Sequence, residues 1–491
     1  MAENQAVLDK GTVLDQKTGQ PTGAALNTAP NTASPNTALR RDASRENKPT
    51  VYDVVIVGGG VCGSALLYSL SQYTNVGKVA LIEKNADVAL VNSRPSSNSQ
   101  TLHFGDIETN YTLEKAETVN RGASMVKSYL LQHDMAQAVY TKYHKMVLAV
   151  GSAQVQKLRE RYEIFKGLFP DLRLIERAEI EALEPNVLKG RNEEEETLAL
   201  FTPEGYTVDY QKLSQSFVQR TMAESGDSVE LMMETKVRSI APVTDEQGNE
   251  RFIITTDKQT ITAKTVAVTS GAHSLLFAKE LGYGMDYALL SVAGSFYFAP
   301  HLLNGKVYTV QLAKLPFAAI HGDPEVHDAQ QTRFGPTAKV MPLLERHKYG
   351  TMWEYFKTAG LSIDAFVSFF NILSDWTILF YIIMNFIYDI PFIGKRLFIR
   401  KVRKIVPSIT LKDLQFAKGY GGIRPQIVNL KTRKLEMGEA KISGRNILFN
   451  ITPSPGASTC LKTAADSCRE LVDFLGEGYR FDEAKMFKDL S

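Results

Sequence analysis

The chain has 491 residues, of which 44% are hydrophobic and 22% are charged, so its composition is that of a folded protein too long for one compact core. The formal net charge of +2 gives no global basic field and no reason to expect nucleic acid as a partner. The 3 cysteines show no Cys-x-x-Cys or Cys/His metal spacing, which argues against a zinc site or disulfide framework and fits a reducing compartment.

Residues 1–49 are predicted to form a disordered tail. Small polar residues and prolines repeat over positions 27–38, and such a segment buries too little apolar surface to offset its ordering entropy. The tail has no apolar core of a secretory signal, and its Asp and Glu residues argue against a mitochondrial presequence.

Order is expected to begin with a βαβ unit. The apolar run at 52–57 predicts a strand buried on both faces, a helix is expected to extend to about Tyr73, and 78–83 predicts the next strand. Further helices are expected over 114–133 and 212–225, and the last one over about 457–475. Strands are expected over 229–240, 251–256, 265–269, 291–298 and 307–311, and a strongly apolar stretch covers about 361–399.

A dinucleotide-binding fingerprint occupies the first strand–helix turn. Gly58, Gly60 and Gly63 fit Gly-x-Gly-x-x-Gly, and Glu83 ends the second strand roughly 20 residues later. Gly58 would permit the tight turn, Gly60 a close approach to pyrophosphate, and Gly63 close helix–strand packing. The helix N-terminus would bind phosphate, and Glu83 would accept hydrogen bonds from ribose hydroxyls. The fingerprint alone leaves FAD and NAD open.

Two later segments favour FAD. An apolar strand at 265–272 ends in Thr-Ser-Gly at Gly271, as does the second conserved strand of FAD proteins in the glutathione-reductase superfamily. Pro455, Gly456 and Ala457 precede the last helix, which in that superfamily points its N-terminus at the flavin and would stabilise negative charge on the reduced ring.

Several ordered motifs then identify a family. The segments 98–105 and 107–112 look like the flavin-ring segment of malate:quinone oxidoreductases, and 292–298, 316–324 and 333–338 look like the substrate-domain motifs of that family. Segments 421–426 and 452–457 complete the pattern, while 183–185 and 208–210 are similar to the wider D-amino-acid oxidase superfamily. The resemblance covers Val51 to the C-terminus.

The resemblance implies an α/β protein with a discontinuous, Rossmann-type, glutathione-reductase-like FAD domain and an α+β substrate domain. The FAD domain would comprise 50–134, 209–284 and 415–491, and the substrate domain 135–208 and 285–414. Besides the fingerprint, the cofactor residues implied are Asn98, Ser99, Gln100, Thr101, Val237, Gly271, Pro455, Gly456 and Ala457; no metal ligand is expected.

Oxidation of a 2-hydroxy acid needs a base for the hydroxyl proton, a hydride acceptor and cations that hold the carboxylates. His321 is the predicted base, because a neutral imidazole accepts a proton near neutral pH, and His103 in the flavin-facing segment is the alternative.

Arg424 is the strongest predicted substrate residue, because a guanidinium pairs bidentately with a carboxylate, as a comparable Gly-x-Arg-Pro arginine does in related oxidases. Arg333 is predicted to hold the second carboxylate of malate. Tyr111 and Gln100 are weaker candidates as hydrogen-bond donors.

A membrane contact is predicted within 361–404. The run at 376–393 is almost long enough to span a bilayer, and Lys395, Arg396, Arg400, Lys401, Arg403 and Lys404 follow it. His321 and Arg424 flank the run and should share one site, which a single crossing would prevent. An interfacial helix is therefore favoured over a span, with a buried helix of the substrate domain as the alternative.

The sequence therefore predicts oxidation of (S)-malate to oxaloacetate, with electrons passing through FAD to a membrane quinone, by a peripheral protein at the cytoplasmic face of the cell membrane. Three alternatives stay open. The chain would be an L-2-hydroxyglutarate dehydrogenase, an oxygen-using amino-acid oxidase, or a catalytically silent flavin-binding membrane module.

Overall fold

The computed structural model describes residues 50–134, 136–311, 320–359, 363–390, 392–436, 440–451 and 455–491. The predicted disordered tail at 1–49 lies outside these residues. So do parts of two family motifs, at 316–319 and 452–454.

The first sheet has a parallel centre in the order β21-β10-β1-β2-β7. These strands are β21 (Ile447–Ile451), β10 (Thr260–Val268), β1 (Val51–Val57), β2 (Val79–Ile82) and β7 (Val229–Met232); β20 (Ala440–Gly444) and the β8 (Val237–Thr244) and β9 (Glu250–Thr256) pair are antiparallel. The register places Val57 beside both Val268 and Ile82. The carboxyl ends of β1, β2 and β10 therefore meet at one edge, as ligand binding at such sheets requires.

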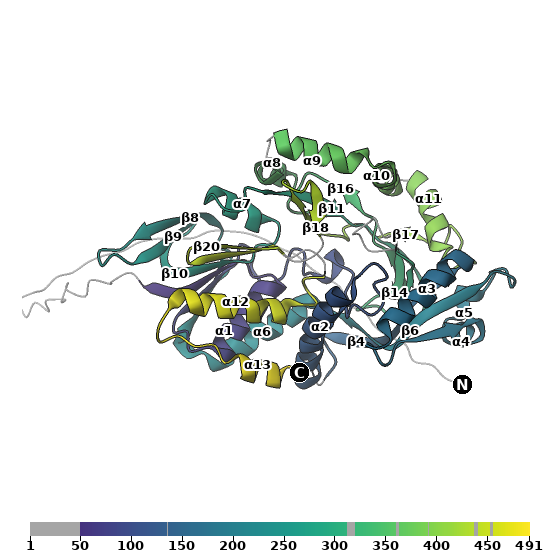
Figure 1. Ribbon diagram of the computed structural model, residues 1–491, viewed down its shortest axis with the longest axis horizontal. Helices are drawn as coiled ribbons and strands as arrows, with labels where there is room; N and C mark the ends of the chain where they lie inside the picture. Colours follow the sequence, from purple (N-terminus) through teal and green to yellow (C-terminus); the bar gives the residue numbers. More distant parts are fainter. Residues whose placement is uncertain are drawn as a thin grey trace, which may run out of the picture. The chain divides into compact units, whose positions relative to one another are not determined.

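Helices cover both faces of this sheet, which explains its continuous apolar strands. One face packs against α1 (Val61–Tyr73), α6 (Tyr210–Glu224), α12 (Cys460–Leu475) and their neighbours α2 (Leu113–His133) and α13 (Glu483–Asp489), through buried residues such as Ile56, Leu66 and Phe217. Figure 1 shows α1, α6 and α12 side by side beneath β10 and β20. The other face carries α7 (His273–Glu280). The predicted α/β class with a doubly covered sheet is confirmed.

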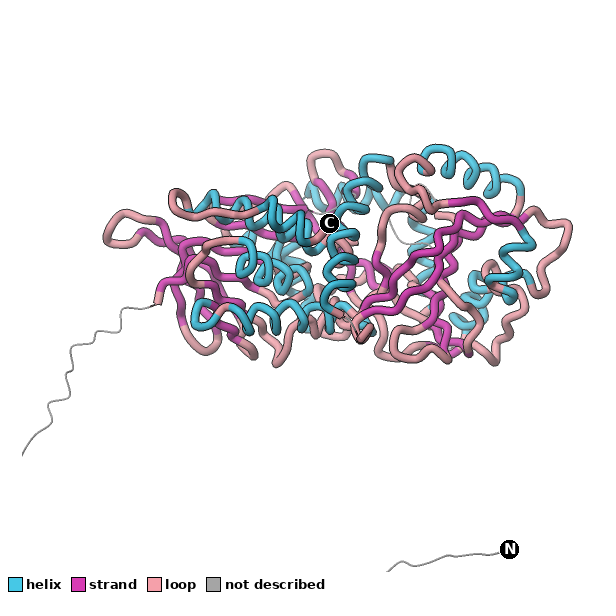
Figure 2. The backbone as a smooth tube through the Cα atoms, turned by 90° about the horizontal axis from the view of Figure 1, so that it is seen from below, coloured by secondary structure: helices cyan, strands magenta, loops and turns pink. Residues whose placement is uncertain are grey.

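The second sheet is mostly antiparallel and is built around the long pair β4 (Tyr140–Val150) and β6 (Thr197–Val208). Its order is β17 (Gln415–Phe416), β12 (Tyr297–Pro300), β15 (Gln331–Gly335), β14 (His321–Pro324), β13 (Lys306–Thr309), β4, β6 and β3 (Thr101–Leu102), with β5 (Arg173–Glu176) also on β6. Helices α3 (Ser152–Phe165), α4 (Arg177–Leu183) and α5 (Pro185–Leu188) accompany it. Figure 2 shows these strands gathered apart from those of the first sheet.

A third, four-stranded sheet has the order β16 (Lys339–Val340), β11 (Tyr287–Ala293), β18 (Ile423–Asn429) and β19 (Lys434–Glu436). Helices α8 (Met352–Ala359), α9 (Ile363–Ser374), α10 (Trp376–Tyr388) and α11 (Ile393–Val402) run past it, as Figure 1 shows. Because β18 pairs with β11, and β3 with β6, sheet pairing crosses the predicted domain boundaries. The division into a cofactor and a substrate domain stays a prediction.

Backbone turns divide two of the predicted strands. The strand expected over 229–240 is two, because Glu234 takes a positive φ of 51° between β7 and β8. The strand expected over 291–298 ends as β11 at Ala293 and resumes as β12 at Tyr297. The last helix starts at Cys460 rather than near Ala457, so Ala457 lies in the turn before it.

Within the described residues, no single helix is long and apolar enough to cross a membrane. One bent pair, Ile378–Tyr388 with Ile393–Val402, meets the length and composition requirement only jointly, with an angle of 119° between the two helices.

Candidate active site

A cavity of about 430 Å³ opens at the carboxyl ends of β1, β2 and β10. Most of the predicted cofactor residues line it: Gly58, Gly60, Glu83, Asn98, Ser99, Thr101, Val237, Gly271, Pro455, Gly456 and Ala457. Arg424 and His103 line it too, whereas Gly63, Gln100, Tyr111, His321 and Arg333 are not among its lining residues. The structure therefore brings together fingerprint, flavin-facing segment and predicted substrate arginine in one cavity.

The glycine turn is closed by contacts that allow no side chain. Gly58 has a φ of +108°, and a Cβ atom there would lie 3.0 Å from Ser270. At Gly63 a Cβ atom would lie 2.0 Å from the Gly58 carbonyl oxygen, so Gly63 packs the helix on the turn without lining the cavity. At Gly60 the nearest atom would be 3.7 Å away, at Ser93 Oγ. Only Gly60 therefore offers open space for a group approaching the first turn of α1.

The start of α1 is electrostatically suited to an anion. It has no side-chain cap and no acidic residue in its first turn. One of the backbone amides in its first turn has a hydrogen-bond partner, since Val61 N donates to Ser93 Oγ at 3.1 Å. The remaining positive end of the helix dipole faces the cavity, where a pyrophosphate would complete the unfilled hydrogen bonds.

Glu83 is fixed in the position that the fingerprint predicts. Its carboxylate accepts hydrogen bonds from Gly59 N at 2.8 Å and from Asn85 N at 2.9 Å. The side chain is buried yet lines the cavity. Such a held carboxylate presents further lone pairs to ribose hydroxyls.

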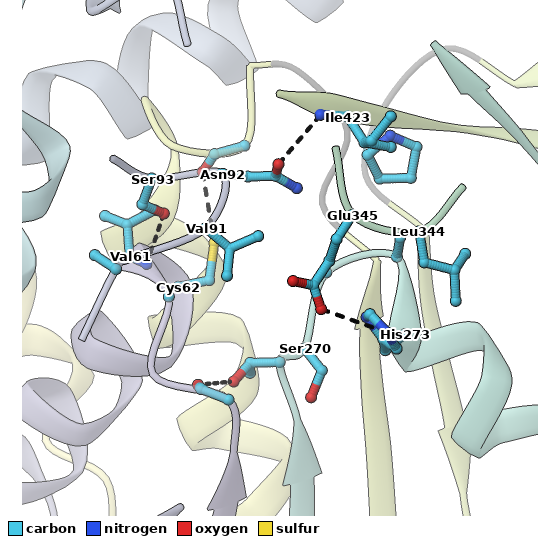
Figure 3. Close-up of a pocket in the computed structure, with 18 of the residues that line it drawn as sticks. Val61, Cys62, Val91, Asn92, Ser93, Ser270, His273, Leu344, Glu345 and Ile423 are labelled. Atoms are coloured by element: carbon cyan, nitrogen blue, oxygen red, sulfur yellow. Dashed lines mark hydrogen bonds and ion pairs between the residues drawn. The ribbon is translucent and has the colours of Figure 1, made fainter. Parts of the chain in front are cut away.

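The walls of the cavity combine parts of the chain that are far apart in sequence. Cys62 on α1 lies 3.8 Å from the Gly456 carbonyl oxygen, which brings the turn before α12 against the fingerprint helix. Figure 3 shows Cys62, Val91 and Ser93 on one side of the cavity and Glu345 and His273 on the other. Segments far apart in the chain thus face each other across the cavity, and each side presents both apolar and polar side chains.

The segment from Asn98 to Thr101 separates the cavity from a buried group of charges. Its outer residues line the cavity, while Gln100 turns away, and its amide donates to Glu325 Oε1 at 2.8 Å. Behind it, Arg333 donates to the carbonyl oxygens of Asn98 at 3.3 Å and Ser99 at 2.9 Å. Arg333 therefore holds the backbone of Asn98 and Ser99 from behind, while these residues line the cavity on their other side.

The buried group, here called the Asp323 cluster, consists of His321, Asp323, Lys306 and Arg333. Asp323 Oδ2 accepts from Lys306 Nζ at 3.1 Å and from Arg333 at 2.9 Å, and its Oδ1 lies 3.6 Å from His321 Nε2. Burial alone would raise the pKa of Asp323, but the charges of Arg333, Lys306 and His321 outweigh it and lower that pKa. The aspartate is therefore an anion shared by two fully buried basic side chains, Lys306 and Arg333.

The two candidate histidines have different surroundings. His321 is fully buried on β14, and its ring packs 4.6 Å from that of Tyr308. His103 lines the cavity, and its Nδ1 is hydrogen-bonded to the buried carboxylate of Glu108. Burial would raise the pKa of Glu108, but the hydrogen bond from His103 leads a set of interactions that lower it overall. His103 thus combines access to the cavity with an ionised partner that fixes its ring.

Arg424 lines the cavity as a cation. It lies on β18 opposite Val292 of β11, and within the described ranges no hydrogen bond or ion pair engages its guanidinium. Burial lowers its pKa, and the charge of Arg333 lowers it further. A partly desolvated guanidinium that has no anionic partner can form two parallel hydrogen bonds with a carboxylate ligand.

Other cavity residues carried no motif signal. Asn92 Oδ1 accepts from Ile423 N at 3.2 Å and ties the loop after β2 to the strand of Arg424 (Figure 3). His273 lies 3.8 Å from Glu345 and 3.2 Å from Glu354. A polar side chain in a loop of mixed composition gives no periodicity or spacing by which to find it. No group of metal-ligating side chains was found among the residues that the structure describes.

Comparisons with known proteins agree with this geometry. The family model described as malate:quinone oxidoreductase matches residues 50–472. The chain is 40% identical to malate:quinone oxidoreductase of Helicobacter pylori over 449 residues, 90% of this chain and 98% of that one. A probable malate:quinone oxidoreductase of Campylobacter jejuni is 40% identical over 450 residues, 89% and 99% of the two chains. The chain belongs to the malate:quinone oxidoreductase family.

More distant relatives share the fold. The human mitochondrial L-2-hydroxyglutarate dehydrogenase is 25% identical over 439 residues, 85% of this chain and 88% of that one. The FAD-bound L-α-glycerophosphate oxidase of Mycoplasma pneumoniae superposes with a TM-score of 0.60 at 18% identity, covering 88% and 96% of the two chains. The predicted fold and family are therefore confirmed.

Proposed function

We propose that this member of the family oxidises (S)-malate to oxaloacetate with FAD as its cofactor and passes the electrons to a membrane quinone. One observation carries the proposal. An unpaired arginine, Arg424, faces the same cavity as the glycine turn and as a histidine, His103, that is oriented by a carboxylate. These are the groups needed to hold a carboxylate and to remove a hydroxyl proton beside a dinucleotide.

FAD, when bound, would accept the hydride from C2 of malate. Gly60 and the start of α1 would hold its pyrophosphate, Glu83 a ribose, and the segments at 98–101 and 455–457 would lie along the flavin. Arg424 would bind one malate carboxylate through two parallel hydrogen bonds. The positive charge thus fixes the substrate so that its C2–H bond is aligned for transfer.

The cavity geometry favours His103 over His321 as the base. The free ring nitrogen of His103 would take the proton of the malate hydroxyl while Glu108 stabilises the imidazolium through the other nitrogen. The binding of the second malate carboxylate by Arg333 stays a prediction, and its contacts do not favour it, because Arg333 is fully buried and is engaged by Asp323, Asn98 and Ser99. With those contacts it acts on the substrate through the charge that it adds next to Arg424.

Anaerobic titration of the purified yellow protein tests this function. (S)-Malate is expected to bleach the flavin absorbance, and oxaloacetate is expected to form in equal amount. L-2-Hydroxyglutarate, the substrate named for the more distant relatives, serves as the competing substrate on the same preparation. A protein that lacks FAD, or a flavin that only 2-hydroxyglutarate bleaches, would refute the proposal.

We further propose that α10 and α11 attach the protein to the cytoplasmic face of the cell membrane. The outer side of α10 exposes Trp376 by 73% and Phe380 by 54%, together with Ile383 and Phe386. The cations of α11 and the turn after it, Lys395, Arg396, Arg400, Lys401, Arg403 and Lys404, follow directly. Aromatic side chains beside lysines and arginines are the composition of a helix lying in an anionic membrane interface.

Vesicle sedimentation tests the attachment. Vesicles of phosphatidylcholine with phosphatidylglycerol should bind the protein, and added salt should release it, because the headgroup attraction is screened. Phosphatidylcholine vesicles alone are the control for lipid charge. Equal binding to both, or no binding to either, would contradict the proposed interfacial contact.

A further inference from the structure

A second cavity, of about 870 Å³, lies between the second sheet and helices α10 and α11. Its walls are largely apolar, with Leu148 and Val150 from β4, Val310 next to β13, and Met384 and Leu397 from the helices. This volume is within the range of sites that bind drug-sized or cofactor-sized molecules. None of the roles assigned so far uses it.

The mouth of this second cavity connects with the exposed side of α10. Phe380 lines the cavity and is also 54% exposed, so its ring belongs to both surfaces. Positive charge surrounds the mouth, since Arg191 and the α11 segment contribute the cations Arg400, Lys401, Arg403 and Lys404 to the lining. An apolar molecule held at an anionic membrane surface would meet this opening first.

The inner end of the second cavity reaches towards the active site. Tyr381 lines the second cavity and packs against the apolar cluster that contains Val292, the residue opposite Arg424 in the β11–β18 pair. Arg424 lines the first cavity. Burial raises the pKa of Tyr381 to about 12, so its hydroxyl keeps its proton at neutral pH and is a hydrogen-bond donor.

We propose that this second cavity binds the ring of an isoprenoid quinone beside Tyr381, with the isoprenoid tail leaving past Phe380. The proposal rests on the proposed function and deepens it by assigning the site of electron delivery. The Tyr381 hydroxyl would donate to one quinone carbonyl, and Met384, Leu148 and Val310 would pack on the apolar ring and first isoprene units.

The chemistry balances without a further reactant. Malate loses two electrons and two protons and becomes oxaloacetate. Each of the two quinone carbonyls gains one electron and one proton and becomes a hydroxyl. Malate itself suits this cavity poorly, because past the cationic mouth its two carboxylates would be desolvated among apolar side chains, a cost that only paired charges offset. The apolar occupant is therefore favoured over the dianionic one.

Filling the cavity tests the assignment. In detergent-solubilised holoenzyme, Met384→Trp places a larger ring where the quinone ring would lie. The measured quantity is the rate of decylubiquinone reduction divided by the rate of anaerobic flavin bleaching by malate. This ratio is expected to fall by roughly tenfold or more. The control Met222→Trp makes the same exchange on α6 at a position exposed by 40% and should keep the ratio.

Two results would overturn the proposal. One is an unchanged ratio in Met384→Trp. The other is slower bleaching and a higher KM for malate with unaltered quinone reduction, which would make the cavity the entrance of the dicarboxylate. If Met384→Trp does not fold, photolabelling of the wild-type holoenzyme with an azido-quinone decides.

Photolabelling also separates this inference from the proposed function. Label is expected in peptides from α10, α11 or β13, and label restricted to the 58–63 and 455–458 segments would refute the second cavity as the quinone site. This readout does not require turnover. A protein whose flavin malate does not bleach would sink the proposed function, while labelling would still show whether quinone occupies this cavity.

Discussion

Two regions on either side of the Asn98–Thr101 segment each contain a histidine and an arginine that are candidates for the reaction, but their chemistry differs. In the Asp323 cluster, Arg333 is fully buried and ion-paired, and His321 is fully buried beside the same aspartate. In the cavity, Arg424 has no anionic partner among the described residues, and His103 faces the open space. The comparison favours the closed charge cluster as a support of the site and the open pair as the groups that we propose for the reaction.

The histidines give the largest expected effect. His103→Ala should retain FAD and slow anaerobic flavin reduction by malate by roughly 10²–10⁴-fold, the usual contribution of a positioned base. The measurement is stopped-flow bleaching at saturating malate. His321→Ala, the matched control from the closed cluster, is also the sequence-based candidate. If His321→Ala slows bleaching more than His103→Ala does, the base belongs to the cluster and the comparison is reversed.

Removing the anion of the closed cluster should destabilise the protein. Asp323→Ala leaves Lys306 and Arg333 buried without their counter-ion, which is expected to cost about 3–5 kcal/mol of unfolding free energy. Chemical denaturation of the holoenzyme, followed by circular dichroism, measures the loss. Asp171→Ala, at an exposed position, is the control. Equal midpoints for the two variants would show that the cluster does not stabilise the fold.

Arg424 should affect the reaction rather than the fold. Arg424→Ala is expected to lose about 2–5 kcal/mol of transition-state binding, or roughly 30- to 5,000-fold in kcat/KM for malate, because one carboxylate loses its partner. Arg424→Lys should keep part of the activity, since the charge remains without the bidentate geometry. A kcat/KM within about threefold of wild type for the alanine variant would remove Arg424 from the substrate site.

The sequence predicted which residues line the site better than it predicted which residues they contact. Gly58, Gly60, Gly63 and Glu83 were readable because the turn, the phosphate contact and the ribose contact each restrict the residue type at a fixed spacing. The spacing of His103 and His321 carries no information on which of them reaches the cavity. That depends on the side of the Asn98–Thr101 segment on which each histidine lies, and this is set by pairing between strands far apart in the chain.

Long-range pairing also explains why the sequence did not predict the neighbours of some elements. β18 carries Arg424 and pairs with β11 across more than a hundred intervening residues, which no local pattern encodes. Besides Asp323, the partners of Arg333 are the backbone carbonyls of Asn98 and Ser99, and any residue type would supply these. By contrast, β1 and α1 were predictable from local sequence, because β1 is a continuous apolar run typical of a strand buried on both faces and the glycine turn after it opens the helix.

The smallest expected effect is a pH dependence confined to the closed cluster. Because the folded-state pKa of Asp323 is lowered from 3.8, its ionised form stabilises the fold above the unfolded pKa, and this contribution is lost as the pH falls through the folded pKa. The stability gap between wild type and Asp323→Asn should thus be constant above about pH 5 and narrow below it. Urea midpoints of both proteins from pH 7 to pH 3.5 measure the gap. A gap that widens on acidification would mean that Asp323 is protonated in the folded protein. Lys306 and Arg333 would then lack a counter-ion, as Arg424 does in the open site.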